Sequence, residues 1–137
     1  MTCEEILQLS ETSLRIEIAK RLGWTNVGME LIRGVGCESQ EFLTGFPPDG
    51  PGRRLTELVP FWESSADLMF EVCYVYGLSG TVKFGPNATG AILWRHDPDS
   101  TTDPVINYAA YGKDAAEALA RAFLLATEGT CLTTPNA

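Results

Sequence analysis

The sequence contains a single histidine, His96, among 137 residues, and its four cysteines are widely separated. No two of them form a Cys-x-x-Cys pair, and they stand at positions Cys3, Cys37, Cys73 and Cys131. A structural zinc site needs four Cys or His ligands at close spacing. The sequence offers no such pattern, so we expect no metal and no cofactor.

Positive charge is also scarce. Ten lysines and arginines stand against eighteen aspartates and glutamates, which gives a net charge of −8. A surface that coats DNA or RNA needs a basic footprint to neutralise phosphates. We therefore expect no nucleic-acid polymer as a partner, whereas a small anion held by a few local arginines is compatible with this charge.

Long apolar runs are missing as well. No stretch approaches the roughly 18 residues that a membrane span needs, and the opening MTCEEILQLS lacks the basic and apolar regions of a secretory signal. We expect a protein of the cytoplasm with no membrane partner, whose cysteines are free thiols. The length suits one domain, residues 1–137.

Helical patterns occur in three parts of the chain. Thr2 and Glu5 have capping-box spacing, which predicts a helix from residue 3, and Ser10 either caps a second segment or interrupts the first. Apolar residues then recur at helical spacing up to Gly23. A further helix is predicted from residue 64 or 65 to Gly77, and a closing helix from Asp114 to about residue 127.

Strand patterns fill most of the remaining sequence. In residues 24–33, apolar residues alternate with polar or small ones, which predicts a strand. Residues 80–85 and 90–96 are predicted to form a hairpin joined by PNAT, and residues 105–112 a fourth strand. Residues 34–60 are rich in glycine and proline and are predicted to be mostly loop, with a short piece near 37–43. We expect an α+β fold with a mainly antiparallel four-stranded sheet, in the order α-β-α-β-β-β-α.

The closing segment YGKDAAEALARAFLLA (111–126) is apolar over most of its helical girth. Glu117 and Arg121 interrupt it and form an i, i+4 pair, which stabilises a helix by a few tenths of a kcal/mol. A helix of this kind is covered on more than one side. It lies either between the sheet and another helix or in a subunit interface.

Residues that catalyse reactions are poorly represented. His96 precedes Asp97, but adjacent strand residues point to opposite faces, which disfavours a direct pair. The glycine-rich GFPPDGPGRR has neither a Gly-Lys-Ser/Thr ending nor a preceding strand, as a phosphate loop requires. We expect no catalytic residue and regard the protein as a binding protein.

Candidate ligand-binding residues lie in two regions. Arg53 and Arg54 provide two guanidiniums that match phosphate oxygens, or they are solvated surface residues. On the predicted hairpin, aromatic rings either stack a base or fill the core, and polar neighbours would read the base. The candidates there and on the first strand are Phe84, Asn87, Trp94, Arg95 and Arg33.

Three segments together resemble the phage ABA-sandwich domain family of bacteriophage and prophage proteins. They are IEIAKRLGW (16–24), PFWESSADLMFEV (60–72) and YGKDAAEALARAFLLA (111–126). The resemblance covers about a third of the chain and adds Arg121 to the candidate ligand-binding residues. Residues 34–59 are unlike the family, and Asp114 replaces a usual threonine.

This resemblance implies a layered α/β/α sandwich. Some phage proteins of this type are sponges, which bind cyclic ADP-ribose isomers or cyclic oligonucleotides of bacterial immunity without cleaving them, as homo-oligomers in the host cytoplasm. The hypothesis is therefore a non-enzymatic, anti-defence binder of a cyclic nucleotide. One alternative is a phage accessory protein that binds and inhibits a host protein, and a weaker one is a small hydrolase that uses His96.

Overall fold

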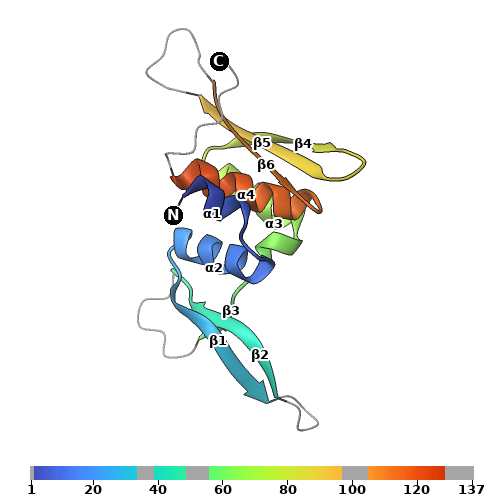
Figure 1. The fold of residues 1–137 in the computed structure, drawn as a ribbon. Coiled ribbons are helices and arrows are strands. Elements are labelled where there is room, and N and C mark those ends of the chain that lie inside the picture. The colour runs from blue at the N-terminus through green and yellow to red at the C-terminus, as the bar shows by residue number, and fades with distance from the viewer. Residues whose placement is uncertain (1, 34–38, 49–55, 97–104, 129–137) are drawn as a thin grey trace. The chain divides into compact units, whose positions relative to one another are not determined.

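The computed structural model describes residues 2–33, 39–48, 56–96 and 105–128 (Figure 1). The elements are, in chain order, α1 (Cys3–Leu7), α2 (Glu11–Arg21), β1 (Thr25–Arg33), β2 (Ser39–Phe46), β3 (Glu57–Leu58), the 3₁₀ turn η1 (Trp62–Ser64), α3 (Ala66–Val75), β4 (Ser79–Phe84), β5 (Thr89–His96), β6 (Val105–Gly112) and α4 (Ala115–Glu128). This mixture of helices and antiparallel strands confirms the predicted α+β class.

The chain divides into two compact units. The first unit comprises Met1–Leu14 and Trp62–Ala137, and the second comprises Arg15–Phe61. Helix α2 begins in the first unit and ends in the second.

The first unit is built on an antiparallel sheet with the strand order β4–β5–β6. Strands β4 and β5 pair from Ser79 with Trp94 to Phe84 with Thr89, which confirms the predicted hairpin. Strands β5 and β6 pair over their full length, ending with Thr89 opposite Gly112. Because side chains alternate along a strand, each cross-strand row belongs to one face of the sheet.

One face of this sheet is packed against helices. Its buried positions on β5 and β6 are Thr89, Ala91, Leu93, Tyr108, Ala110 and Gly112. Figure 1 shows α1, α3 and α4 on that side of the sheet. Since no described helix of the first unit covers the other face, this unit has one helical layer rather than the two of the expected α/β/α sandwich.

Helix α4 forms the centre of the first unit. Ten of its fourteen residues are buried, and it packs against β5, β6, α3, η1 and α1. The Tyr76 ring meets the Phe123 ring edge-on, with centroids 5.1 Å apart, a favoured aromatic geometry. Of the two placements that the sequence left open, the structure has the helix covered within its own chain.

Side-chain caps define where two helices begin. The Thr2 hydroxyl accepts a hydrogen bond from the Glu5 N–H, and the Glu5 carboxylate accepts one from the Thr2 N–H, so the predicted capping box is confirmed. Ser65 caps α3 by accepting from the Leu68 N–H. Gly77 follows the C-cap of α3 with a φ of +73°, a conformation that glycine adopts without strain.

The second unit contains the antiparallel sheet β1–β2–β3. Within the predicted loop 34–60, the short piece expected near 37–43 is strand β2, which covers residues 39–46 and pairs along β1. Gly45 counted as a loop signal in the sequence. In the structure it marks a close approach, because a Cβ there would lie 3.1 Å from both the Thr25 carbonyl oxygen and Val27 Cγ2.

The predicted four-stranded sheet is wrong. Strand β1 pairs with β2 in the second unit and does not join β4, β5 and β6, so the structure has two three-stranded sheets. The physical reason is local: β1 finds an antiparallel partner in the next segment of the chain, which sequence patterning had assigned to a loop. The predicted helix from residue 3 is the short α1, and Ser10 precedes a second helix, α2, which was one of the two readings of Ser10.

The described cysteines differ in whether they form a disulfide bond. Cys3 is disulfide-bonded, which corrects the prediction that all four cysteines are free thiols. Cys73 is a free thiol on the buried side of α3, and burial raises its pKa to about 12. Cys37 and Cys131 lie outside the described residues.

A polar contact fastens strands of the second unit. The Glu30 carboxylate oxygen Oε2 accepts hydrogen bonds from the Thr44 hydroxyl at 2.8 Å and the Thr56 hydroxyl at 2.9 Å. These bonds, chiefly that of Thr44, stabilise the ionised carboxylate and lower the pKa of Glu30 below its ordinary value of 4.5. The stabilisation is therefore present above the pKa of the unfolded chain and is lost as pH falls through the lower folded-state pKa.

We expect Gly112→Ala to destabilise the first unit by about 1–3 kcal/mol. A Cβ at Gly112 would lie 2.6 Å from the Ala118 backbone nitrogen, so strand β6 and helix α4 would have to separate. The free energy of unfolding in urea measures this loss. Gly28→Ala is the control, because nothing lies within 4 Å of its Cβ position, and equal losses in both variants would contradict the close approach.

We expect Thr44→Val to raise the pKa of Glu30 towards 4.5, because the variant removes the stronger of the two hydroxyl donors. An NMR titration of the Glu30 carboxyl carbon measures the change. Thr12→Val, an exposed substitution on α2, should leave this pKa where it is. A titration curve unchanged by Thr44→Val would contradict the role of the hydroxyl.

Candidate functional site

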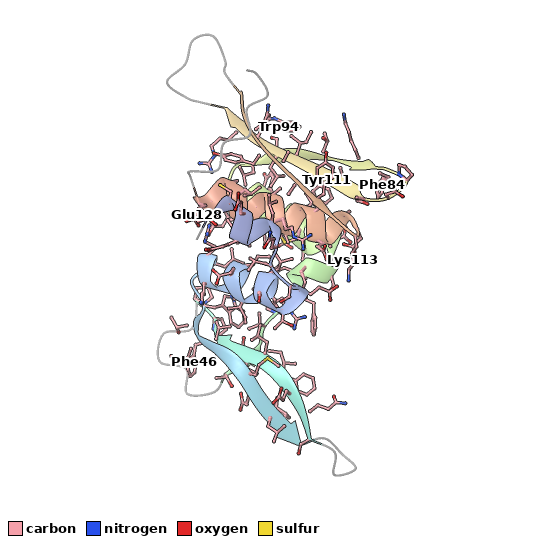
Figure 2. All side chains as sticks on the ribbon, viewed as in Figure 1. Phe46, Phe84, Trp94, Tyr111, Lys113 and Glu128 are labelled. Carbon is pink, nitrogen blue, oxygen red and sulfur yellow. The ribbon has the colours of Figure 1, made fainter. Side chains whose placement is uncertain are left out.

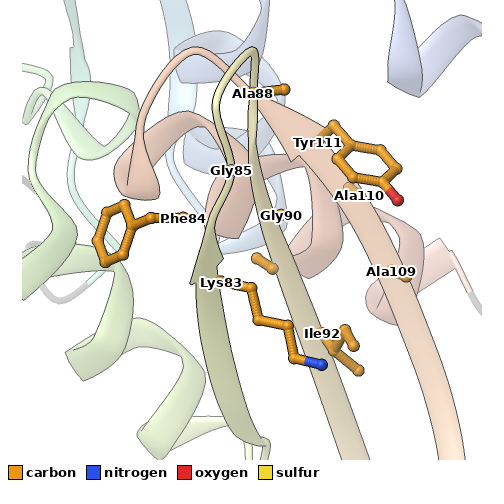
Figure 3. A pocket seen from close by; sticks show the side chains of 10 residues that line it. Lys83, Phe84, Gly85, Ala88, Gly90, Ile92, Ala109, Ala110 and Tyr111 are labelled. Carbon is orange, nitrogen blue, oxygen red and sulfur yellow. The ribbon is translucent and has the colours of Figure 1, made fainter.

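A cavity of about 220 Å³ lies on the β4–β5–β6 sheet near the β4–β5 hairpin (Figure 3). It is lined by ten residues of the three strands and the hairpin: Lys83, Phe84, Gly85, Ala88, Gly90, Ala91, Ile92, Ala109, Ala110 and Tyr111. Most of these residues are small or apolar, and one is a cation. We call this the sheet cavity.

Strand register explains which side chains border the sheet cavity. Lys83, Gly90 and Tyr111 form one cross-strand row, and Ile92 with Ala109 belongs to the next row on the same face. This is the face opposite the helices. Figure 3 shows the Lys83, Ile92 and Tyr111 side chains on this side of the strands.

Gly90 provides the floor between Lys83 and Tyr111. A Cβ at Gly90 would lie 3.3 Å from a carbon of the Tyr111 ring, so the ring lies directly against the glycine backbone. Such a ring over a glycine also stabilises a sheet by covering bare backbone. The arrangement leaves the aromatic ring, 71% exposed as a residue, beside a lysine on an otherwise apolar surface.

The aromatic residues predicted from sequence are placed differently. Phe84 is 81% exposed and belongs to the lining of the sheet cavity, but its ring points away from Lys83 and Tyr111 (Figure 3). Trp94 is half-buried and pairs with Asn107, one row beyond Ile92, outside the lining (Figure 2). Asn87 is exposed in the β4–β5 turn.

Sequence reasoning did not select the two side chains that flank the floor, Lys83 and Tyr111. A signal for them was present, because the alternation in VINYAAYG sets Asn107, Ala109 and Tyr111 on one face. The missing information was the register that places Gly90 between Lys83 and Tyr111.

Of the predicted arginines, the two whose side chains the structure describes, Arg95 and Arg121, are not in the lining of the sheet cavity. Arg53 and Arg54 lie outside the described residues, and Arg33 ends β1 with its side chain undescribed. Arg95 donates a hydrogen bond of 3.3 Å to the Ala126 carbonyl near the C-terminal end of α4. A cation at this end of a helix interacts favourably with the helix dipole.

Arg121 holds three parts of the first unit together. Its Nη1 donates to the Glu117 carboxylate at 2.6 Å and to the Tyr111 carbonyl at 3.0 Å, and its Nη2 donates to the Leu9 carbonyl at 3.0 Å. The side chains of Arg121 and Glu117 are only 16% and 10% exposed. Arg121 thus forms the predicted pair with Glu117, and it also fixes the backbone of Tyr111.

Reactive side chains are dispersed over the described part of the chain. Within it, no three His, Cys, Asp or Glu side chains come together in a way that would hold a metal ion. The raised pKa of Cys73 keeps that thiol protonated, so it is a poor nucleophile. His96 ends strand β5, and its side chain is not described.

Among the described helices, none has both the length and the apolar character to cross a membrane.

No family model matches this chain, and the comparison with curated proteins gives no match either. The geometry of the sheet cavity is therefore the main guide to function.

We expect Arg121→Met to lower the free energy of unfolding by about 3–5 kcal/mol, because it leaves the buried Glu117 carboxylate without its partner. Chemical denaturation monitored by circular dichroism measures the loss. The double variant Arg121→Met, Glu117→Gln removes both charges and should recover part of it. A double variant as unstable as the sum of the two single variants would contradict the pairing.

Proposed function

We propose that this protein binds a cyclic nucleotide in the sheet cavity and retains it without cleavage, as a phage-encoded antagonist of a bacterial immune signal. The observation that carries the proposal is the row Lys83–Gly90–Tyr111, where an exposed ring lies against the glycine backbone and a cation lies on its other side. A purine or pyrimidine base is flat and has a π-face, and a phosphate is an anion.

Each part of the ligand has a counterpart in this row. A base stacks on the Tyr111 ring, an interaction of about 1–3 kcal/mol per base. The glycine at position 90 lets the Tyr111 ring lie against the strand, so the exposed part of the ring is what a base would stack on. Lys83 supplies the positive charge for a phosphate, although as a point charge rather than the bidentate fork that an arginine presents.

The lining also supports binding without reaction. Its ten residues include no carboxylate, histidine or cysteine. Hydrolysis of a phosphodiester needs a nucleophile with a general base or a metal ion. A ligand held by stacking and one ammonium group meets no carboxylate, histidine or cysteine there, which supports retention without cleavage.

The size of the sheet cavity favours a homo-oligomer. Pockets that enclose a drug-sized ligand usually measure about 300–1,000 Å³, and this cavity measures about 220 Å³. One subunit therefore accommodates one base with its sugar, and a second subunit closes over the rest of a cyclic ligand. The resemblance of residues 16–24, 60–72 and 111–126 to phage ABA-sandwich proteins supplies the biological context.

We expect calorimetry against a panel of cyclic mono-, di- and trinucleotides to find one that binds, and Tyr111→Ala to weaken it by about 1–3 kcal/mol. Tyr111→Phe keeps the ring and should bind normally. Lys83→Gln should weaken binding and flatten its salt dependence. Tyr74→Ala, an exposed tyrosine on α3, is the matched control and should bind normally.

Mass spectrometry then tests retention, because the bound nucleotide should return unaltered when the complex is denatured by heat. The proposal fails if no member of the panel binds at micromolar protein, or if the nucleotide returns cleaved. It also fails if Tyr111→Ala and Tyr74→Ala have the same effect.

A further inference from the structure

Helix α3 presents a second surface, on the side that faces solvent. We call it the α3 surface and define it by Asp67, Phe70, Glu71, Tyr74 and Val75. These positions are spaced three or four residues apart, so they lie on one side of the helix. The opposite side is buried in the first unit through Met69, Val72 and Cys73.

The α3 surface exposes apolar side chains that a helix normally buries. Phe70 is 45% exposed, Val75 is 75% exposed and Tyr74 is 83% exposed. Single exposed apolar residues are ordinary on protein surfaces, whereas adjacent ones mark a site of interaction. Three neighbours on a ten-residue helix therefore indicate a surface that another molecule covers.

The charge of the α3 surface restricts what that molecule is. Asp67 and Glu71 are one turn apart among the apolar side chains, and the sequence of α3, ADLMFEVCYV, contains no lysine or arginine. Anionic lipids and nucleic-acid phosphates repel such a surface. A second copy bound through the same surface by two-fold symmetry would bring these carboxylates towards each other.

We propose that the α3 surface binds a basic amphipathic segment of another protein. Its apolar side chains would pack on Phe70, Tyr74 and Val75, and its lysines or arginines would pair with Asp67 and Glu71. This follows the mode in which an apolar face gives affinity and complementary charges at the rim steer association. The proposal does not depend on the sheet cavity, because α3 contributes no residue to its lining.

The experiment uses the full chain and a labelled synthetic helix of about 18 residues, five turns, with leucines on one face and lysines on the other. Fluorescence anisotropy should show binding. Tyr74→Ala should weaken this binding about fivefold or more, as expected for an aromatic anchor. Tyr111→Ala is the matched tyrosine control and should leave it unchanged.

A charge control separates a defined site from general attraction to a protein of net charge −8. Asp67→Asn with Glu71→Gln removes two negative charges from the α3 surface, and Glu4→Gln with Glu41→Gln removes two exposed charges elsewhere. We expect only the first pair to weaken binding, about fivefold or more. Equal weakening by both pairs overturns the proposal, as does peptide binding that Tyr74→Ala leaves intact.

Light scattering tests whether a second copy of the chain covers the α3 surface instead. If the wild-type chain is an oligomer that Tyr74→Ala converts to a monomer, then the α3 surface is covered by a second copy, and the proposed basic partner is wrong. All substituted side chains are exposed, and circular dichroism of each variant checks that the chain still folds.

Discussion

One guanidinium, inside a helix made largely of alanine and leucine, sets the arrangement of the first unit. Arg121 is held at once by the Glu117 carboxylate and by the carbonyls of Tyr111 and Leu9. Its Nε is buried and has no hydrogen-bond partner, so within the described part of the chain its charge is compensated through these three acceptors. Because an uncompensated buried charge is costly, β6, α4 and the segment after α1 must come together in one register.

The parts of the fold that local chemistry decides were predictable. The capping box at Thr2, the Ser65 cap and the stop at Gly77 are encoded by residues within one helical turn of each other. The β4–β5 hairpin is similarly local, since its two strands are adjacent in the sequence. The buried α4 followed from an apolar surface that continues around most of the helix.

The parts that depend on distant pairing were not predictable. Glycine at position 45 reads as a loop residue, and only the close approach of β1 shows why a strand has it there. Sequence reasoning missed Lys83 and Tyr111 for the same reason, because these residues and Gly90 form one row only once the register of three strands is known. Arg121 was found by its position in the closing segment, but its role depends on Leu9, 112 residues away.

The short connection between β6 and α4 has a consequence for the outer surface. The Tyr111 carbonyl is held by Arg121, and the next residue, Gly112, touches the backbone of α4. The ring of Tyr111 therefore turns only about its own side-chain bonds, on a main chain that the interior immobilises. A ligand that binds there meets a preorganised aromatic ring, so little conformational entropy of the protein is lost on binding. Conversely, a substitution that weakens the packing of the α4 alanines would also increase the mobility of the Tyr111 ring. The mobility of this exposed ring therefore reports on how tightly the interior is packed.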